Sequence, residues 1–157
     1  MNNHQIKIAI ALGGNIGDVS NTFLQAITKL KENGLIDIVF SSLHSNPAVS
    51  CIPDTPDFTN AALTALWGKT PEELLELCQK IETEFGRPKI HSSNQSRVLD
   101  LDIILYGNLI INKEYLQIPH PRAHKRSFVL IPLAEIAPDW IFPTENCTIK
   151  DLISNLN

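Results

Sequence analysis

Cysteine is scarce in this chain, and its three copies lie too far apart for a disulfide framework or a zinc site. Cys51, Cys78 and Cys147 form no C-x-x-C pair, so we expect free thiols in a reducing compartment, the cytoplasm. Long apolar runs are missing too: no stretch approaches the roughly 20 apolar residues of a membrane span, and we expect no signal peptide at residues 1–5. The sequence thus predicts neither a membrane partner nor a disulfide-rich secreted fold.

A strong charge of one sign is also absent. The 157 residues carry 13 Lys+Arg against 17 Asp+Glu, a net charge of −4, and this balance argues against nucleic acid as a partner. No G-x-x-x-x-G-K-[ST] motif, nucleophile-elbow serine or cysteine with an evident histidine partner occurs, so P-loop and covalent nucleophilic chemistry are not indicated. With no low-complexity run, we expect one folded domain over residues 1–157.

Apolar periodicity predicts a strand–helix–strand–strand–helix–strand order. Thr70, Pro71 and Glu73 are typical of a helix N-terminus with a capping box, and a Gly107-Asn108 turn leads into 109–111. The expected elements are strands at 6–12, 36–43, 58–67 and around 97–105, helices at 19–33 and 71–85, a loop at 45–57 and a helical segment near 129–136. This order is that of an α+β, ferredoxin-like βαββαβ sandwich, here with an added C-terminal hairpin and helical segment. We expect both main helices on one face of an antiparallel sheet, leaving the other face to loops and ligand.

The most informative stretch is RVLDLDIIL at residues 97–105, which contains two carboxylates inside a strand-like apolar run. Strand side chains alternate faces, so Asp100 and Asp102 share one face and Leu99, Leu101 and Ile103 the other. Two like charges about 7 Å apart repel by about 2–3 kcal/mol at an effective dielectric near 20. A divalent cation such as Mg²⁺ would turn that repulsion into attraction; the alternative is a half-exposed strand that happens to carry two aspartates.

All four arginines lie close to this carboxylate pair in the sequence. Arg87, Arg97, Arg122 and Arg126 fall within 40 residues, together with lysines and histidines of the same region. Arginine binds phosphate in a planar, bidentate way, so the clustering indicates a polyphosphate held between metal and guanidinium groups, against the alternative of an ordinary basic surface. The glycines at 13, 14 and 17 follow a strand and open a helix; a structural turn is favoured there over an anion site.

Several of these motifs resemble one family, the 6-hydroxymethyl-7,8-dihydropterin pyrophosphokinases of folate synthesis. The resemblance covers nearly the whole chain and rests on ALGGN at 11–15, DFTNAA at 57–62, RVLDLDI at 97–103, PHPR at 119–122, RSFVL at 126–130 and PLAEIAP at 132–138. It implies a ferredoxin-like fold and transfer of pyrophosphate from ATP, the co-substrate, to the pterin's hydroxymethyl oxygen, with release of AMP. It also implies two Mg²⁺ ions as cofactors and ATP and the pterin as partners. We expect a monomer and leave contacts with neighbouring folate-pathway enzymes open.

The resemblance also implies roles for individual residues. The expected catalytic residues are Arg87, Arg97, Asp100 and Asp102, with the two aspartates as metal ligands. The expected ATP-binding residues are Gln79, Glu82, Lys89, Ile103, His120 and Arg126. The expected pterin-binding residues are Asn46, Pro47, Val49, Phe58, Asn60 and Phe128, of which the two phenylalanines would sandwich the flat ring and Asn60 would read its amide-like edge.

The chain departs from the family pattern at a few positions. Asn94 stands where relatives often carry tryptophan, Ser96 where a proline usually precedes the arginine, Asn46 where threonine is common and Ser50 where glycine is frequent. The first two lie in the loop 88–96, expected to close over the substrates, and put its closure and the turnover rate in doubt. Two alternatives stay open: another two-metal enzyme, such as a nucleotidyl transferase or cyclase, and a non-catalytic RNA- or metabolite-binding module. The second lacks exposed aromatic residues beside the aspartate pair.

Overall fold

A computed structural model of the chain describes residues 4–46, 57–86 and 98–156. An antiparallel sheet forms its centre, in the order β2 (Ile36–Phe40), β4 (Phe58–Trp67), β1 (Ile6–Gly14), β5 (Asp100–Tyr106). A short strand, β3 (His44–Asn46), continues the β2 side and pairs with the start of β4. The central strands β1 and β4 run in register from Ile6↔Trp67 to Gly14↔Thr59, and each has a second neighbour, β5 beside β1 and β2 beside β4.

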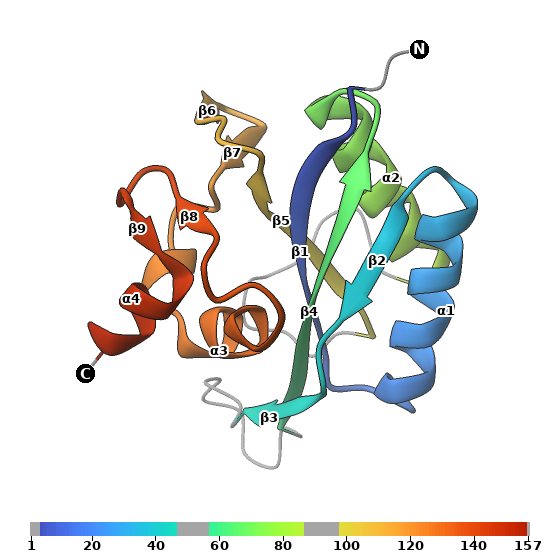
Figure 1. Ribbon diagram of the computed structural model, residues 1–157. Coiled ribbons are helices and arrows are strands. Elements are labelled where there is room, and N and C mark those ends of the chain that lie inside the picture. Colours follow the sequence, from blue (N-terminus) through green and yellow to red (C-terminus); the bar gives the residue numbers. More distant parts are fainter. Residues whose placement is uncertain (1–3, 47–56, 87–97, 157) are drawn as a thin grey trace.

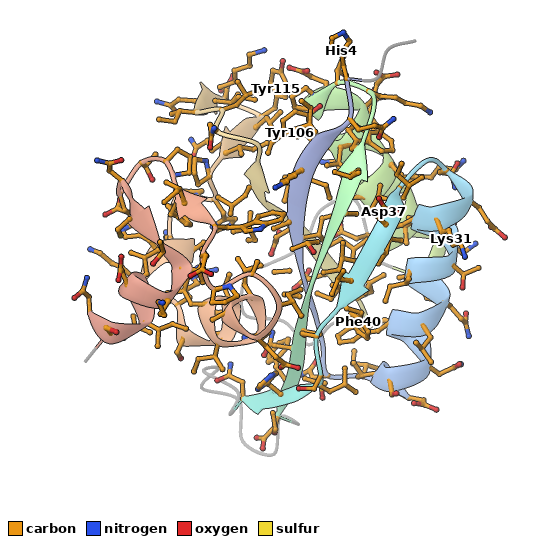
Figure 2. The ribbon with its side chains drawn as sticks, in the orientation of Figure 1. His4, Lys31, Asp37, Phe40, Tyr106 and Tyr115 are labelled. Carbon is orange, nitrogen blue, oxygen red and sulfur yellow. The ribbon has the colours of Figure 1, made fainter. Side chains whose placement is uncertain are left out.

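Two helices cover one face of this sheet, as the sequence predicts. Helix α1 (Val19–Glu32) and helix α2 (Pro71–Glu84) lie on the same side in Figure 1. The capping box expected at the start of α2 is confirmed: Thr70 Oγ1 accepts the Glu73 N–H at 3.1 Å, and Glu73 accepts the Thr70 N–H at 3.0 Å. Phe40 points from β2 toward α1 (Figure 2) and meets Phe23 edge-on.

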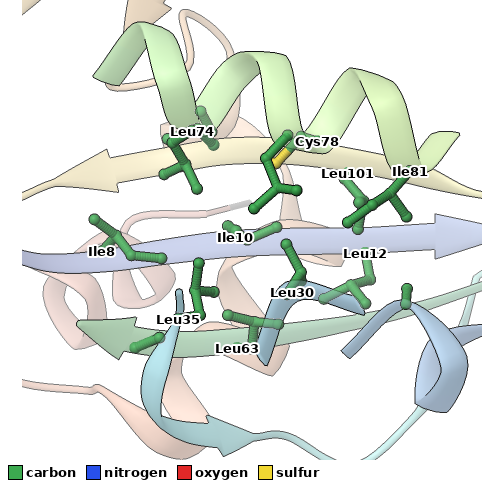
Figure 3. Close-up of a cluster of buried hydrophobic side chains, with 14 of the residues drawn as sticks. Ile8, Ile10, Leu12, Leu30, Leu35, Leu63, Leu74, Cys78, Ile81 and Leu101 are labelled. Carbon is green, nitrogen blue, oxygen red and sulfur yellow. The ribbon is translucent and has the colours of Figure 1, made fainter. Parts of the chain in front are cut away.

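Large aliphatic side chains fill the space between this face and its helices. They come from every second position of β1, from β4 and β5, and from the inner faces of α1 and α2. Figure 3 shows Ile8, Ile10, Leu12, Leu30, Leu35, Leu63, Leu74, Cys78, Ile81 and Leu101 packed together. We call this cluster the first core.

The opposite face of the sheet also carries helices, which differs from the expectation that it would be left to loops and ligand. Helix α3 (Ser127–Ile136) and helix α4 (Ile149–Ser154) lie on this side (Figure 1). They bury a second core, which includes Ala9 and Ala62 from the sheet and Leu130 and Leu133 from α3. The apolar residues of the C-terminal segment thus cover a face whose central strands carry small side chains.

A bulge in β5 changes which face its side chains occupy. Ala9 pairs with Leu105 while the next residue, Ile10, pairs with Ile103, so Ile104 is an extra residue. Ile103 packs in the first core, whereas Ile104 and Leu105 both pack in the second. Asp100 and Asp102 precede the bulge and keep the strict alternation that the sequence predicts.

The remaining elements are short. Strands β6 (Ile111–Lys113) and β7 (Leu116–Ile118) form a hairpin, η1 (Ala123–Lys125) is a single 3₁₀ turn, and β8 (Ile141–Phe142) pairs with β9 (Cys147–Thr148). The strand expected at 36–43 ends at Phe40, and β3 includes the first two residues of the loop expected at 45–57. Among the described residues, no helix has both the length and the apolar run needed to cross a bilayer.

Candidate active site

One face of the sheet gathers the polar side chains that the sequence singles out. Residues directly opposite in an antiparallel pair point to the same side, and Gly13 pairs with Asn60 on one flank and Asp100 on the other. The next row on this face is Ala62, Ala11 and Asp102. The face is the one that α3 covers, since Ala62 packs in the second core.

Gly13 lets the side chains of Asn60 and Asp100 lie close on either side of β1. A Cβ built at Gly13 would lie 3.1 Å from Asn60 Nδ2 and 4.0 Å from Asp100 Cβ. Asn60 is buried, with 8% of its surface exposed, and its Oδ1 has no hydrogen-bond partner in the described structure. Buried polar atoms are normally paired, so this oxygen is suited to a ligand with a hydrogen-bond donor.

The aspartates are held on a strand that α2 fixes from the side. Asp100 is half-buried and Asp102 is exposed, while the N–H of Leu101, between them, donates to Glu82 Oε2 at 2.7 Å. Among the described strands β5 is the last of the sheet, so this bond satisfies an N–H on its outer edge. Glu82, expected on the nucleotide side, therefore also fixes the backbone between the two carboxylates.

The carboxylates on this face fit magnesium better than a metal that is coordinated by protein atoms alone. Within the described residues no group of three or more histidine, cysteine, aspartate or glutamate side chains converges. Magnesium usually takes one or two carboxylates and completes its shell with water and substrate phosphates. Two aspartates on one strand face, one of them open to solvent, meet that requirement.

A basic group lies beside Asp102. Burial lowers the pKa of His120, and the charges of Arg126 and Arg122 lower it further while that of Asp102 opposes them. A pKa below the ordinary 6.5 favours the neutral ring at pH 7. The Arg122 N–H donates to His120 Nδ1 at 3.3 Å, so the neutral ring carries its proton on Nε2. The backbone N–H of His120 bonds Ile104 O at 3.4 Å and ties this segment to β5.

Arg126 and Phe128 connect this basic group to helix α3. The guanidinium carbon of Arg126 lies 5.5 Å from the centre of the Phe128 ring, a cation–π distance. Burial lowers the pKa of Arg126, Arg122 lowers it further, and Asp102 opposes both. Phe128 is half-buried against the second core, so the arginine and the ring are held in one unit at the start of α3.

The aromatic and amide residues of the expected pterin pocket share the face of the aspartates. Asn46 pairs with Phe58 across β3 and β4, and Phe58 lies two positions from Asn60 on the same strand. Each is therefore on the Asp100 side of the sheet. Phe58 is half-buried, which leaves part of its ring exposed.

Two expected nucleotide-binding residues lie away from this face. Gln79 is exposed on α2, about one turn before Glu82. The Ile103 side chain is buried in the first core, on the opposite side of the sheet from the aspartates, so only its backbone could reach a nucleotide on the aspartate face. The expected site residues that lie outside the described residues are Pro47, Val49, Arg87, Lys89 and Arg97.

Sequence reasoning missed a polar cluster next to this site. Glu135 of α3 binds Ser42 and His44, 93 and 91 residues away in the chain. The alternation Ser42, His44, Asn46 on an extended segment would have been the only local signal. The partner of that segment depends on how α3 packs, which spacing does not reveal.

Comparison with known proteins places the chain in a family. Residues 9–138 match the family model of 7,8-dihydro-6-hydroxymethylpterin-pyrophosphokinase (HPPK). A 2-amino-4-hydroxy-6-hydroxymethyldihydropteridine pyrophosphokinase of Synechocystis sp. is 40% identical over 149 residues, covering 94% of this chain and 75% of the relative. The enzyme of that name from Haemophilus influenzae is 39% identical over 141 residues, covering 88% and 86%.

Solved structures show the same fold in a longer chain. A crystal structure of Plasmodium falciparum HPPK-DHPS A437G aligns with a TM-score of 0.70 at 15% identity, covering 98% of this chain and 46% of that one. The folic acid synthesis protein fol1 of Pneumocystis carinii is 39% identical over 149 residues, which are 20% of its length. The family model and the bacterial relatives decide the assignment: this chain belongs to the 7,8-dihydro-6-hydroxymethylpterin-pyrophosphokinase family.

Proposed function

We propose that this chain transfers pyrophosphate from ATP to 6-hydroxymethyl-7,8-dihydropterin on the sheet face that carries Asp100 and Asp102. The family assigns the reaction class, the ATP co-substrate and the place in folate biosynthesis. In this reaction the hydroxymethyl oxygen forms a bond to the β-phosphorus, the bond to the α,β-bridging oxygen breaks, AMP leaves and the hydroxyl proton is released. The observation that carries the proposal is the register Asn60–Gly13–Asp100, which sets a pterin-reading amide and a metal-binding carboxylate in one row.

Asp100 and Asp102 would hold two Mg²⁺ ions. Magnesium bound there would supply positive charge to the phosphate oxygens, at a position that the two aspartates fix. The Glu82 carboxylate holds the Leu101 backbone and so limits movement of both aspartates. Phosphoryl-type transfer depends on positioning and charge stabilisation more than on a protein nucleophile, which agrees with the residue types on this face.

Cations complete the phosphate side of the site. Arg126 offers a planar pair of donors to a phosphate, and neutral His120 offers its Nε2–H. A bound triphosphate would raise the pKa of His120 against the burial and the arginines that lower it. Arg87 and Arg97 neutralise charge on the transferred group, and Gln79, Glu82, Lys89 and Ile103 contribute to the nucleotide side by family resemblance.

The pterin lies between aromatic faces, on the side of Gly13 away from Asp100. Phe58 and Phe128 stack on the ring, and the Asn60 amide pairs with its polar edge. The lone Oδ1 of Asn60 supports this role, because a donor on the ligand would satisfy it. Asn46 and, by family resemblance, Pro47 and Val49 line the same pocket.

The framework proposed for this site is ferredoxin-like. The strand order β2–β4–β1–β5, antiparallel throughout, with α1 and α2 on one face, supports a βαββαβ sandwich. The β6–β7 hairpin and the segment from α3 to α4 are additions to it. Residues 1–157 act as a single pyrophosphokinase domain in this proposal.

Phosphorus NMR of the protein with ATP, Mg²⁺ and 6-hydroxymethyl-7,8-dihydropterin tests the proposal. We expect AMP and a pterin diphosphate to appear together, only when the pterin and Mg²⁺ are both present. Formation of ADP would indicate ordinary kinase chemistry, and release of free pyrophosphate would favour a nucleotidyl transferase or cyclase. Either result, or the absence of pterin-dependent turnover, would overturn the proposed reaction.

A further inference from the structure

A carboxylate on helix α3 binds the segment that joins β2 to β3. Glu135 Oε2 accepts the backbone N–H of Ser42 at 2.9 Å, and Glu135 Oε1 accepts the Ser42 hydroxyl at 2.7 Å. His44 Nε2 lies 2.9 Å from the same Oε1 and 3.3 Å from Ser42 Oγ. Three polar groups of one segment thus converge on one side chain.

This arrangement is unsuited to nucleophilic catalysis despite its Ser–His–Glu composition. A catalytic triad needs the serine on one ring nitrogen of the histidine and the acid on the other. Here the same nitrogen, Nε2, faces both the hydroxyl and the carboxylate, and the hydroxyl donates directly to the carboxylate. The histidine is therefore not placed to accept the serine proton as it does in a triad, and the cluster holds parts of the fold together.

Both sides of the cluster lead directly to the expected pterin pocket. On the sheet side, His44 pairs with Asn60, and β3 ends at Asn46 opposite Phe58. On the helix side, Glu135 follows Phe128 by seven residues, or about two turns, so the two share a face of α3 about 10 Å apart along its axis. Helix α3 contacts β3 and β4 and lies beside the lower half of the sheet, near β3, in Figure 1.

The sheet end of the cluster is itself anchored. Ser41 is buried; its N–H donates to Ala62 O and its hydroxyl accepts the Ala62 N–H, both at 2.9 Å. Ala62 lies in the same row of the sheet as Asp102. The segment that Glu135 binds is therefore also hydrogen-bonded to β4, one residue away from Ser42 and in the sheet row that contains Asp102.

We infer that Ser42, His44 and Glu135 form a clamp that sets the spacing between the two aromatic walls of the pterin pocket, Phe58 on the sheet and Phe128 on α3. The inference rests on the proposed function and makes all three positioning residues, because their side chains bind one another and they act on the pterin through Phe58 and Phe128. Hydrogen bonds from His44 and Ser42 lower the pKa of Glu135 to about 2, so the carboxylate stays charged and the clamp closed at neutral pH.

The test compares Glu135→Gln with the wild-type enzyme by steady-state kinetics of AMP formation. The amide keeps the size of the side chain but loses its charge and one acceptor. We expect the KM for the pterin to rise about fivefold to tenfold, because bonds to a charged group are stronger than neutral ones. The KM for ATP and kcat should change less than twofold. Ser42→Ala should act in the same direction and Ser42→Thr, which keeps the hydroxyl, should restore the wild-type KM.

Glu72→Gln is the matched control. Glu72 Oε2 lies 2.9 Å from Lys113 Nζ, and the Glu72 side chain is 39% exposed. Glu135 has the same exposure and lies at the same distance from its own partner, His44 Nε2. It joins α2 to the β6–β7 hairpin at the far end of the molecule from β3 (Figure 1), and its loss should leave both KM values unchanged.

Each outcome separates the clamp from the reaction. An active wild-type enzyme with an unchanged pterin KM in Glu135→Gln would overturn the clamp alone. A parallel loss in kcat and both KM values, with a lower Tm, would mean a merely structural contact and would overturn it too. A wild-type chain that forms no AMP would overturn the proposed function and the clamp with it.

Discussion

Replacing Gly13 by alanine, which adds one methyl group, should lower activity while leaving stability nearly unchanged. The new Cβ would lie 3.1 Å from Asn60 Nδ2, closer than an ordinary contact, and 4.0 Å from Asp100 Cβ. The Asn60 side chain would have to move by a few tenths of an ångström, while the methyl would occupy the floor between the amide and the carboxylate. We expect kcat/KM for the pterin to fall about tenfold to hundredfold, or about 1.4–2.7 kcal/mol, since small misplacements of bound groups cost that much.

The same substitution should hardly change the free energy of unfolding. Gly13 lies in regular strand β1 and does not have a positive φ, so alanine fits its backbone. Removing glycine stabilises by about 0.4–1 kcal/mol through the unfolded chain, which offsets the close contact with the Asn60 amide. The expected Tm therefore lies within about 3 °C of wild type for a chain of this size.

Gly14→Ala is the control for this experiment. A Cβ at Gly14 would lie 2.5 Å from the backbone oxygen of Val98, and backbone cannot move aside as a side chain can. We expect a loss of about 1–3 kcal/mol in unfolding free energy. Kinetics of AMP formation and thermal unfolding on both variants decide the matter. If Gly13→Ala keeps the wild-type kcat/KM, the space above Gly13 is not part of the substrate site and the reasoning fails.

Three further predictions use other contacts. Glu82→Ala removes the acceptor of the Leu101 N–H and should lower the unfolding free energy, measured by urea denaturation, by about 1–3 kcal/mol. Glu82→Gln should recover most of this loss. Equal stability of wild type and both variants would contradict the assigned hydrogen bond. The pKa of Glu135 is lowered from 4.5 to about 2, so the stability that this carboxylate contributes is full above pH 4.5 and is lost as the pH falls through about 2. The difference in unfolding free energy between wild type and Glu135→Gln should therefore close over that range. A difference that is unchanged at pH 2 would be inconsistent with this. Asp102→Asn removes the charge that raises the pKa of His120, so an NMR titration should give a lower pKa for this ring. Activity should fall by several orders of magnitude while the fold is unchanged. An unaltered His120 titration would refute the electrostatic interaction between His120 and Asp102.

Local signals predicted the main elements well because they act within a few residues. The Thr70–Glu73 capping box starts α2 where expected, and the alternation of Ile8 and Ile10 with smaller residues gives β1. The alanines of β4 were a weaker signal for a strand. They are explained by its central place, since Ala61 packs in the first core and Ala62 in the second, and small side chains allow both layers to approach closely.

What the sequence did not reveal depends on contacts between distant segments. Strands of two or three residues, such as β3 and β8, exist only through their partners and carry no periodicity of their own. The covering of the second face by α3 and α4 follows from how the C-terminal segment docks. The face occupied by Leu105 follows from the bulge at Ile104, which the register of β1 imposes.

The common face of the two aspartates was more predictable than the surface beside it, for a physical reason. Asp100 and Asp102 are two residues apart, so their common face follows from strand geometry alone. Asn60 was expected only from the family resemblance, and its place in the row of Asp100 depends on the register of β4 on β1. The bonds of Glu135 to Ser42 and His44 needed the position of a helix across the sheet, and sequence spacing contains no such information.

One signal for the floor of the site is present in β1 and can be read without the structure. Its two faces carry different sizes: Ile8, Ile10 and Leu12 toward the first core, and Ala9, Ala11 and Gly13 toward the second. On this second face the residues change from alanine to glycine as the strand approaches Asp100. Helix α3 covers the alanines, while Gly13 lies between two polar side chains. A helix can pack on alanine, whereas a pterin bound as proposed, between Asn60 and a magnesium-bound phosphate, would need a floor with no side chain. The progression from alanine to glycine along one strand face therefore marks where helix packing ends and where the proposed substrate site would begin.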